Sequence, residues 1–415
     1  MDQPHKTVSV LHLVAADNML FPILRDQLCY LRAAGFLIHT ASMDGPLGRR
    51  IQEDGFSWTP LPLTREMAPL SDWRALRCIE QFCRQHSFDI VHTHTPKGNV
   101  IGQWAARRAG VPIVLQTLHG FYFHEHTPRW QRRKWIWIER FSARHSDHIL
   151  CQNPEDVETA LREGIARPAQ ITCLGNGIDI ERFHPSAPDD SRRARVRQEL
   201  KVPADALVVG MVGRFVAEKG FPEFLAAAER IARGTGSQPS GRGLTARATH
   251  FLAVGHKLAS ERAGETWSPP LSGPLKDSLT VLQDRDDMAD LYAAMDIHVL
   301  PSHREGFPRV LMEGAATGLP QVATNIRGCR QTVEDGKTGF LVPVGDAAAL
   351  AERLERLLSN PALRAGFGTA ARAKALAEFD QRQVFAKVQA CYEQLIARKT
   401  GLSAPAPGTA PQMQP

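Results

Sequence analysis

The sequence repeats one pattern twice, in which short apolar runs alternate with amphipathic stretches. In the first half the apolar runs are "TVSVLHLVA", "FLIHTAS", "FDIVHTH", "GVPIVLQTLHG", "SDHILCQN" and "AQITCLGNG". Runs of this length are typical of parallel strands that are buried on both faces, and the stretches between them have the periodicity of helices. The alternation predicts a doubly wound parallel sheet.

The pattern restarts after the polar segment "PSAPDDSRR", residues 185–193, with the predicted strands "ALVVGMVGR", "ATHFLAVG", "IHVLPS" and "LPQVAT". A chain of 415 residues is also longer than one hydrophobic core normally supports. We therefore predict α/β architecture with two Rossmann-like, doubly wound domains facing a central cleft, over 1–185 and 186–378. The Gly/Ser-rich stretch 234–248 predicts a surface loop, and the proline-rich end, 400–415, predicts a disordered tail.

Composition narrows the class of protein. A hydrophobic content of 43% supports sizeable cores, and a net charge of +6 favours anionic partners such as phosphorylated ligands, nucleic acid or a membrane surface. The seven cysteines are scattered without zinc-like spacing, which is typical of reduced thiols in a cytoplasmic protein. No secretory signal and no run of 18 apolar residues is present, so any membrane contact is predicted to be peripheral.

The loop "RFVAEKGFP" follows a predicted strand and precedes a predicted helix. Its cations, Arg214 and Lys219, stand beside glycines at a helix start, where unpaired N–H groups and the helix dipole favour an anion. This arrangement suits a diphosphate, although a solvated turn is the simpler alternative.

The loop "HREGFPRVLMEGA" carries two glutamates eight residues apart, Glu305 and Glu313. Gly306 allows a ligand to approach the backbone, and Pro308 is typical of the first turn of a helix. Glu305 is therefore predicted just before the helix and Glu313 inside it. Carboxylates accept hydrogen bonds from sugar hydroxyls, so the pair suits a hydroxyl-rich ligand, while a structural salt bridge is the alternative.

Several segments together resemble one enzyme family. "EGFPRVLMEGAATGLPQVAT" looks like the E-x7-E signature of the retaining glycosyltransferases of family 4, "MVGRFVAEKGF" is similar to the family's VGR and EKG segment, and "LGNGIDIERFHP" resembles its linker motif. "DIVHTHTPKGNVIG" and "GVPIVLQTLHGFYFHE" resemble the N-terminal domain of the branch with capsule and exopolysaccharide enzymes. The resemblance covers most of residues 7–395.

The resemblance implies a GT-B fold, a nucleotide-sugar held mainly by the C-terminal domain, and a crossover helix, 379–399, that packs back on the N-terminal domain. It also implies roles for individual residues. Arg214 and Lys219 hold the donor diphosphate, Glu305 contacts hydroxyls of the donor sugar, Gly306 and Phe307 offer backbone contacts, and Glu313 binds the nucleotide ribose.

His119 corresponds to the family's active-site histidine beside the donor sugar. From the residues alone it is either structural or functional, and its place after a buried strand favours function. His92 and His94 also end a strand and are interpreted as lining the cleft, with Lys97 as a phosphate contact for an acceptor.

Two further features modify the predicted site. Many relatives carry a Gly-Gly loop after the first strand, whereas this chain has "AADNMLFP", so Asp17 and Asn18 are interpreted as facing the acceptor. The segment "DRDD" contains Asp284 and Asp286 in a metal-binding spacing, but it precedes a helix and is typical of turn and capping chemistry. We predict no metal and no cofactor beyond the donor, and we assign Arg285 as a ligand contact.

The segment "HTPRWQRRKWIWIERFSARHSD" interleaves cations with tryptophans over 129–144. It fits a partly solvated helix or a membrane interface, and nucleic acid is disfavoured because no known nucleic-acid-binding motif accompanies it. We favour an anionic membrane surface.

These observations predict a metal-independent, retaining glycosyltransferase. The predicted donor is a nucleotide-sugar, UDP-linked, that supplies a hexose or N-acetylhexosamine. The predicted acceptor is a lipid-linked sugar or a saccharide in surface polysaccharide or glycoconjugate synthesis, and the predicted location is the cytoplasm, peripherally at the inner face of the plasma membrane. The alternatives are a GT-B sugar-nucleotide epimerase and a non-catalytic regulator that binds sugar-nucleotides.

Overall fold

The computed structural model describes residues 7–64, 68–124, 127–186, 190–203, 205–234, 248–256 and 275–399. The predicted tail and almost all of the predicted loop 234–248 lie outside these residues. The chain forms two compact units: unit 1 combines Met1–Gly175 with Arg382–Pro415, and unit 2 is Asn176–Gln381. Residues 176–185, which the sequence placed in the first domain, therefore belong to unit 2.

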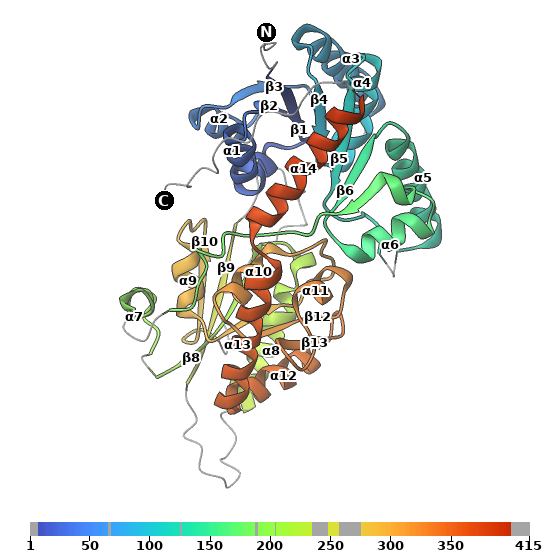
Figure 1. Cartoon of the computed structure of the whole chain (residues 1–415). Coiled ribbons are helices and arrows are strands. Elements are labelled where there is room, and N and C mark those ends of the chain that lie inside the picture. Colours follow the sequence, from blue (N-terminus) through green and yellow to red (C-terminus); the bar gives the residue numbers. More distant parts are fainter. Residues whose placement is uncertain are drawn as a thin grey trace. The chain divides into compact units, whose positions relative to one another are not determined.

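Unit 1 is built on a seven-stranded sheet. Its strands are β1 (Ser9–Leu13), β2 (Leu37–Ser42), β3 (Ser57–Pro60), β4 (Ile90–Thr93), β5 (Ile113–Leu118), β6 (His148–Cys151) and β7 (Ile171–Cys173). They are ordered β3-β2-β1-β4-β5-β6-β7, and every neighbouring pair is parallel (Figure 1). Successive strands are added towards one edge of the sheet from β1 to β3 and towards the other edge from β4 to β7. The switch point therefore lies between β1 and β4, and open α/β sheets bind ligands at such a point.

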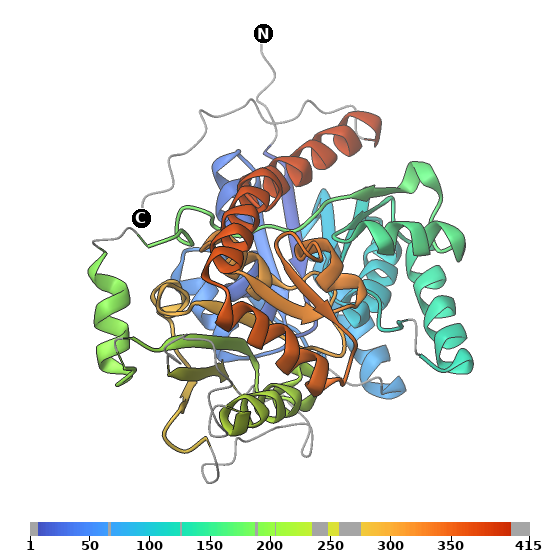
Figure 2. The same ribbon diagram turned by 90° about the horizontal axis from the view of Figure 1, so that it is seen from below.

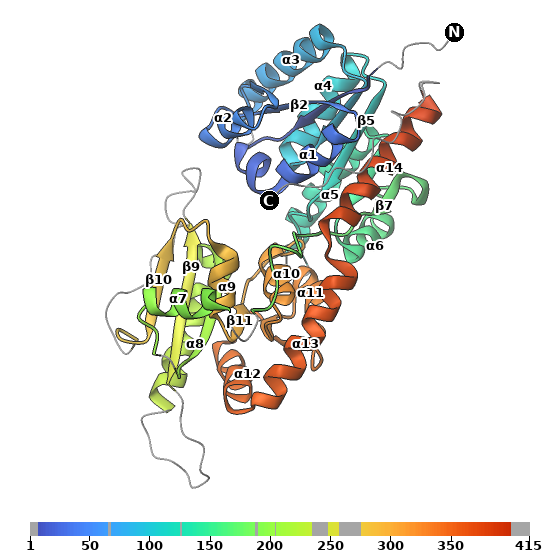
Figure 3. The same ribbon diagram turned by 60° about the vertical axis from the view of Figure 1, so that its left-hand side comes forward.

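Helices cover both faces of the unit 1 sheet. One face packs against α1 (Arg25–Ala33) and α14 (Gln381–Lys399), whose Val388 and Tyr392 share a core with Val10 and Ile90 (Figure 3). The other face packs against α3 (Pro69–His86) and α4 (Gln103–Arg108). The remaining helices are α2 (Pro46–Glu53), α5 (Arg129–Arg144) and α6 (Pro154–Arg162). The last helix of the chain is thus part of the core that the first strands form.

Unit 2 repeats the design with six parallel strands, ordered β10-β9-β8-β11-β12-β13 (Figure 2). These strands are β8 (Leu207–Arg214), β9 (Thr249–His256), β10 (Leu279–Gln283), β11 (Ile297–Leu300), β12 (Gln321–Thr324) and β13 (Gly339–Val342). Here the order reverses between β8 and β11.

The helices of unit 2 also divide between two faces. α8 (Phe221–Gly234) and α12 (Ala347–Ser359) share one core with the sheet. The opposite core holds residues of α7 (Ser191–Glu199), α9 (Met288–Ala294), α10 (Arg309–Ala316) and α13 (Pro361–Glu378). The two parallel sheets with helices on both faces confirm the predicted pair of doubly wound domains. Among the described helices, none is both long and apolar enough to cross a membrane.

Candidate functional site

The candidate site in unit 2 lies at the carboxyl edge of its sheet. β8 and β11 are parallel neighbours, and β12 pairs with the other side of β11. Because parallel strands end at the same edge, the loops after these three strands meet there. Arg214 is the last residue of β8, the loop after β8 carries Lys219, and the loop after β11 carries Glu305.

The β8–α8 loop closes tightly against the loop after β11. It forms a single 3₁₀ turn, Ala217–Lys219, and then Gly220 takes a left-handed conformation with φ of 85°. A β-carbon on Gly220 would lie 2.1 Å from the carbonyl oxygen of Pro301. Only glycine fits both the backbone angle and this approach.

Gly220→Ala is therefore expected to lower the free energy of unfolding by about 2 kcal/mol or more, since a left-handed alanine alone costs about 1–2 kcal/mol. The loop is also expected to move away from Pro301 and to weaken nucleotide binding. Urea unfolding and calorimetric titration with UDP measure the two effects. Gly366→Ala is the matched control, because a β-carbon there has nothing within 4 Å. Equal unfolding free energies and equal UDP affinities of the two variants would contradict the role of Gly220 in closing the β8–α8 loop.

Lys219 and Glu305 form an ion pair in this structure. Lys219 Nζ donates to Glu305 Oε1 at 2.5 Å, and the two side chains are only 17% and 9% exposed. A charge-assisted bond between two largely buried groups is stronger than a surface pair. The structure thus joins two residues that the sequence assigned separately to the diphosphate and to the sugar.

Glu218 holds the two loops together from the neighbouring position. Its carboxylate accepts from Arg304 Nε at 2.6 Å, and its carbonyl accepts from the backbone N–H of His303 at 2.8 Å. Burial opposes ionisation of Glu218, but the bond from Arg304 and the charges of Arg304, Lys219 and Arg214 together lower its pKa. Arg214 and Lys219 therefore both lie close enough to Glu218 to favour its ionised form.

The backbone of Glu305 is supported by α11 (Arg327–Thr332), which follows β12. A β-carbon on Gly328 would lie 2.8 Å from Glu305 Cβ, so this glycine lets the helix pack directly against the site. Sequence reasoning missed Gly328, and its only signal was a glycine shortly after a predicted strand.

Glu313 lies inside α10, as predicted, and its carboxylate is tied to α9. Tyr292 donates its hydroxyl to Glu313 Oε2 at 3.1 Å. Burial raises the pKa of Glu313, although the charge of Arg309 and the bond from Tyr292 oppose that shift. The remaining oxygen of Glu313 suits a hydroxyl donor. Nearby, the Phe307 carbonyl accepts from Asn176 Nδ2 at 3.0 Å.

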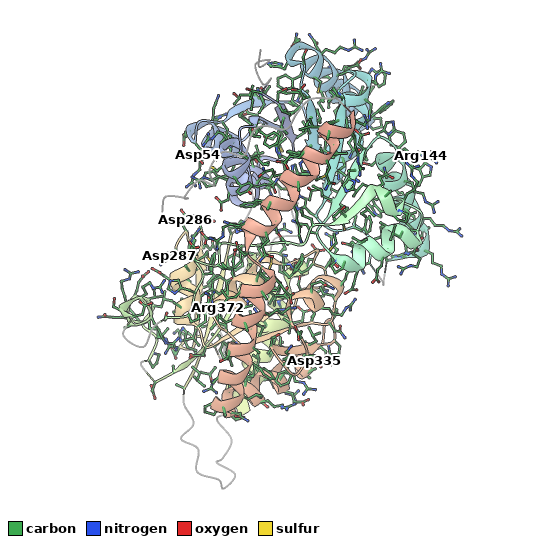
Figure 4. The ribbon with its side chains drawn as sticks, in the orientation of Figure 1. Asp54, Arg144, Asp286, Asp287, Asp335 and Arg372 are labelled. Carbon is green, nitrogen blue, oxygen red and sulfur yellow. The ribbon has the colours of Figure 1, made fainter. Side chains whose placement is uncertain are left out.

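Arg285, assigned from sequence as a ligand contact, is bound to two carboxylates. It donates to Asp287 Oδ1 at 2.7 Å and to Glu199 Oε1 at 2.7 Å, and the bonds to Asp287 and Glu199 raise its pKa. Asp286 and Asp287 lie just before α9 (Figure 4). The ligand role of Arg285 stays a prediction, and a ligand there would have to compete with Asp287 and Glu199.

His119 belongs to unit 1 and follows β5. Its Nδ1 lies 3.1 Å from Gln152 Oε1, and its Nε2 lies 3.4 Å from His94 Nδ1. Burial lowers the pKa of His119 to about 4, against the opposing effect of the Gln152 bond. His119 is thus a neutral imidazole with both nitrogens engaged.

His92 and His94, interpreted from sequence as lining a cleft, are instead interior residues, 0% and 1% exposed. They sit beside His12 of β1, which sequence reasoning missed because it is one polar residue in an apolar run. These three histidines are the group within the described residues whose nitrogens approach closely enough to hold a metal ion. Asp284 and Asp286 are in no such group there.

Two other residues interpreted from the sequence as acceptor contacts have partners within unit 1 in this structure. Lys97, assigned to an acceptor phosphate, is 7% exposed and pairs with Asp72 Oδ1 at 2.5 Å. Asp17, interpreted as facing the acceptor, accepts from the Leu47 N–H at 3.0 Å and so caps the start of α2. Lys97 and Asp17 both follow strand ends, and both have bonding partners within unit 1.

Two family models match the chain in sequence. The one described as "Glycosyl transferase 4-like domain" matches residues 22–177, and the one described as "Glycosyl transferases group 1" matches residues 206–360. The UDP-Gal:alpha-D-GlcNAc-diphosphoundecaprenol alpha-1,3-galactosyltransferase of Escherichia coli is 28% identical over 319 residues, which are 77% of this chain and 79% of the relative. The capsular polysaccharide biosynthesis glycosyltransferase CapM of Staphylococcus aureus is 27% identical over 401 residues, 95% of this chain and 100% of the relative.

Solved structures share the fold. Anabaena Alr3699/HepE in complex with UDP-glucose superimposes with a TM-score of 0.73 at 20% sequence identity, covering 93% of this chain and 99% of that one. Because the two family models match segments in both units and the fold agrees, the chain belongs to the group 1 glycosyltransferases of the family 4 type, which have the GT-B fold.

Proposed function

We propose that this glycosyltransferase moves a hexose or N-acetylhexosamine from a UDP-sugar to a lipid-linked or saccharide acceptor in surface polysaccharide synthesis, with retention at the anomeric carbon and without a metal. The name of the Escherichia coli relative specifies a UDP-sugar donor and a diphosphoundecaprenol-linked acceptor, and HepE was crystallised with UDP-glucose. These names support the donor and acceptor classes of the proposal.

The observation that carries the proposal is the Lys219–Glu305 pair. It sets a cation and a carboxylate 2.5 Å apart, beside Arg214, at the edge of the sheet where α/β proteins bind ligands. A nucleotide-sugar carries an anionic diphosphate next to a sugar ring with hydroxyl groups, so it needs a cation and a hydrogen-bond acceptor side by side. Lys219 and Arg214 suit the first, and Glu305 suits the second.

The proposed reaction proceeds on one face of the sugar. The bond from the anomeric carbon to the β-phosphate oxygen breaks, the acceptor oxygen bonds to the same carbon from the same side, and the acceptor proton passes to a phosphate oxygen of the leaving UDP. Lys219 and Arg214 stabilise the charge that develops on the diphosphate, which is the task that a metal has in other transferases.

Product stereochemistry tests this reaction. The anomeric coupling constant of the product, measured by NMR with a donor of known configuration, is expected to show retention. Turnover is expected to persist in EDTA. An inverted product, or activity that EDTA abolishes and magnesium restores, would overturn the mechanism. Thermal shift with a panel of nucleotide-sugars identifies the donor, because a bound ligand raises the melting temperature by mass action.

We also propose that α5 brings the enzyme to an anionic membrane. Its exposed face, the α5 face, is formed by Trp130, Arg133, Lys134, Trp137 and Arg144. Trp130 and Trp137 are each 69% exposed, and Arg144 projects from the end of the helix (Figure 4). Tryptophan and cations on one helix face suit the headgroup region.

Not every cation predicted for this surface is available. Arg132 pairs with Glu163 Oε1 at 2.5 Å, and Arg140 Nε donates to the Glu163 carbonyl at 2.9 Å, so both attach α5 to the end of α6. Trp135 stacks on Tyr122 with centroids 4.9 Å apart. The α5 face excludes these three residues.

Changing Arg133 and Lys134 to Glu is expected to abolish sedimentation with anionic vesicles at low salt, because each cation near such a surface contributes about 1 kcal/mol. Wild type is expected to bind, and to be released as salt shortens the Debye length below about 8–10 Å. Arg230→Glu with Lys337→Glu, two exposed cations of unit 2, makes the same change in net charge and serves as the control. An equal loss of vesicle binding in both double variants would indicate a general effect of net charge and would refute the α5 face as the membrane-binding surface.

A further inference from the structure

A continuous chain of hydrogen bonds runs through the interior of unit 1. It links side chains from β5, β4, α14 and β1 to those in the loops after β4, β5 and β6, in the order Thr117, His92, Tyr392, His12, His94, His119 and Gln152. The successive distances are 2.8, 2.6, 3.3, 2.9, 3.4 and 3.1 Å. This set of seven residues is called the histidine chain below.

The protons of the histidine chain can be assigned one by one. A neutral imidazole has one donor and one acceptor nitrogen, and a carbonyl oxygen only accepts. Gln152 Oε1 therefore requires the proton of His119 on Nδ1, which makes His119 Nε2 an acceptor. His94 must then donate from Nδ1, and the same reasoning applies at each step inward.

The inner half closes the assignment without a leftover group. His12 donates from Nδ1 to His94 and accepts at Nε2 from the Tyr392 hydroxyl. Tyr392 accepts in turn from His92 Nδ1, and Thr117 donates to His92 Nε2. In this set all four imidazoles are neutral with the proton on Nδ1, and burial, which lowers the pKa of each of them, is consistent with the neutral state.

The arrangement resists change at any single ring. If His94 or His119 alone moved its proton to Nε2, it would present a donor to a donor on one side and an acceptor to an acceptor on the other. Every other consistent set needs the Gln152 amide turned over and all the bonds between Gln152 and the Tyr392 oxygen reversed, while the bonds from Tyr392 to Thr117 can stay or reverse. Chains of this kind also polarise their members cooperatively.

We propose that the histidine chain is a tautomer lock, in which Gln152 and His94 act as positioning residues that keep His119 neutral with its proton on Nδ1. The inference rests on the proposed function, with His119 as the active-site histidine that the family resemblance implies. His119 then serves the reaction as a fixed, neutral group and transfers no proton, in keeping with a mechanism in which the leaving phosphate takes the acceptor proton.

A divalent metal is the competing occupant. The ligand atoms of His12, His92 and His94 lie within 4.8 Å of one another. The histidine chain already gives every nitrogen of these three rings a hydrogen-bond partner at 3.4 Å or less. A metal would have to break several of these bonds at once, so the lock is the better account of the cluster.

Histidine tautomers are read directly from ¹⁵N chemical shifts of the full-length protein, whether or not it turns over. We expect the Nδ1–H form for His12, His92, His94 and His119 at neutral pH. Gln152→Met removes the acceptor at the end of the chain and is expected to give His119 a mixture of tautomers. Gln152→Glu keeps the acceptor and is expected to restore the Nδ1–H form.

Kinetics connects the lock to the reaction. Gln152→Met is expected to lower kcat about tenfold or more, because a small displacement of a group in the active site slows the reaction strongly. KM for the donor is expected to stay close to wild type. Tyr30→Phe, which removes a hydroxyl beside α14 but outside the histidine chain, is the control and should change neither tautomers nor kcat.

Four outcomes would overturn the inference: an Nε2–H or cationic His119 in wild type, failure of Gln152→Glu to restore the tautomer, an altered tautomer with unchanged kcat, or stoichiometric zinc bound by the three histidines. A wild-type protein that shows the expected tautomers but transfers no sugar would instead refute the proposed function and leave the assignment of protons standing.

Discussion

Lowering the pH from 7 to 5 is expected to destabilise unit 1 by several kcal/mol. His12, His92 and His94 are 0%, 0% and 1% exposed, and burial lowers the pKa of His12 to about 3 and the other two pKa values well below their usual range. The unfolded chain binds a proton at each histidine below about pH 6.5, whereas the folded unit does not. The free energy of unfolding therefore decreases as the pH is lowered through this window, by about 1.4 kcal/mol per pH unit for each histidine.

Urea unfolding at a series of pH values, followed by tryptophan fluorescence, measures this dependence. The signal reports mainly on unit 1, which contains Trp58, Trp73, Trp104, Trp130, Trp135 and Trp137. His12→Asn is expected to reduce the slope by about 1.4 kcal/mol per pH unit, whatever it does to stability at pH 7. His184→Asn, at a partly exposed position in unit 2, is the control outside the interior histidines. A stability that does not vary between pH 5 and 7 would show that the interior histidines accept protons in the folded state.

Glu305→Gln is expected to raise the affinity for free UDP and to lower turnover of the nucleotide-sugar, two effects of opposite sign. In the unliganded enzyme the Glu305 carboxylate neutralises Lys219 at 2.5 Å, so an uncharged side chain releases that cation for the diphosphate. The same change removes the carboxylate that we assign to the sugar hydroxyls. Lys219→Ala is expected to weaken UDP binding and to cut kcat/KM by about 10²–10³.

Calorimetric titration with UDP and steady-state kinetics with the nucleotide-sugar separate these effects. Lys337→Ala is a matched control, because Lys337 also pairs with a glutamate of unit 2, Glu334 at 2.7 Å, but is 68% exposed. It should alter neither measurement. Weaker UDP binding by Glu305→Gln would show that Glu305 supports the diphosphate site rather than competing for its cation.

The strands inside the two sheets were predictable from the sequence, and three of the four edge strands were not. The apolar runs predicted β1, β2, β4 to β9, β11 and β12, which lie mostly inside the two sheets. β3, β10 and β13 were not predicted, and each lies at the edge of a sheet. β3 and β10 contain no buried residue, so they lack the apolar run by which a strand is recognised.

The members of the donor site were predictable as residues but not as partners. Lys219 and Glu305 are 86 residues apart, and their contact depends on the pairing of β8 with β11, which no local pattern encodes. The same limit explains the histidines. His92 was noticed because it ends a strand, but its 2.6 Å bond to Tyr392 joins residues 300 positions apart and makes it an interior residue.

The return of α14 to unit 1 has a consequence for synthesis on the ribosome. The first 175 residues of unit 1 leave the exit tunnel long before the helix that completes their core, because Asn176–Gln381 is made in between. At about 5–20 residues per second, that interval is roughly ten to forty seconds. During this time the face of the sheet that later packs against Val388, Tyr392 and Leu395 is uncovered, so the nascent N-terminal half is a natural client for chaperones that bind apolar surface. Emergence of α14, rather than emergence of the first 175 residues, is the event that lets unit 1 close.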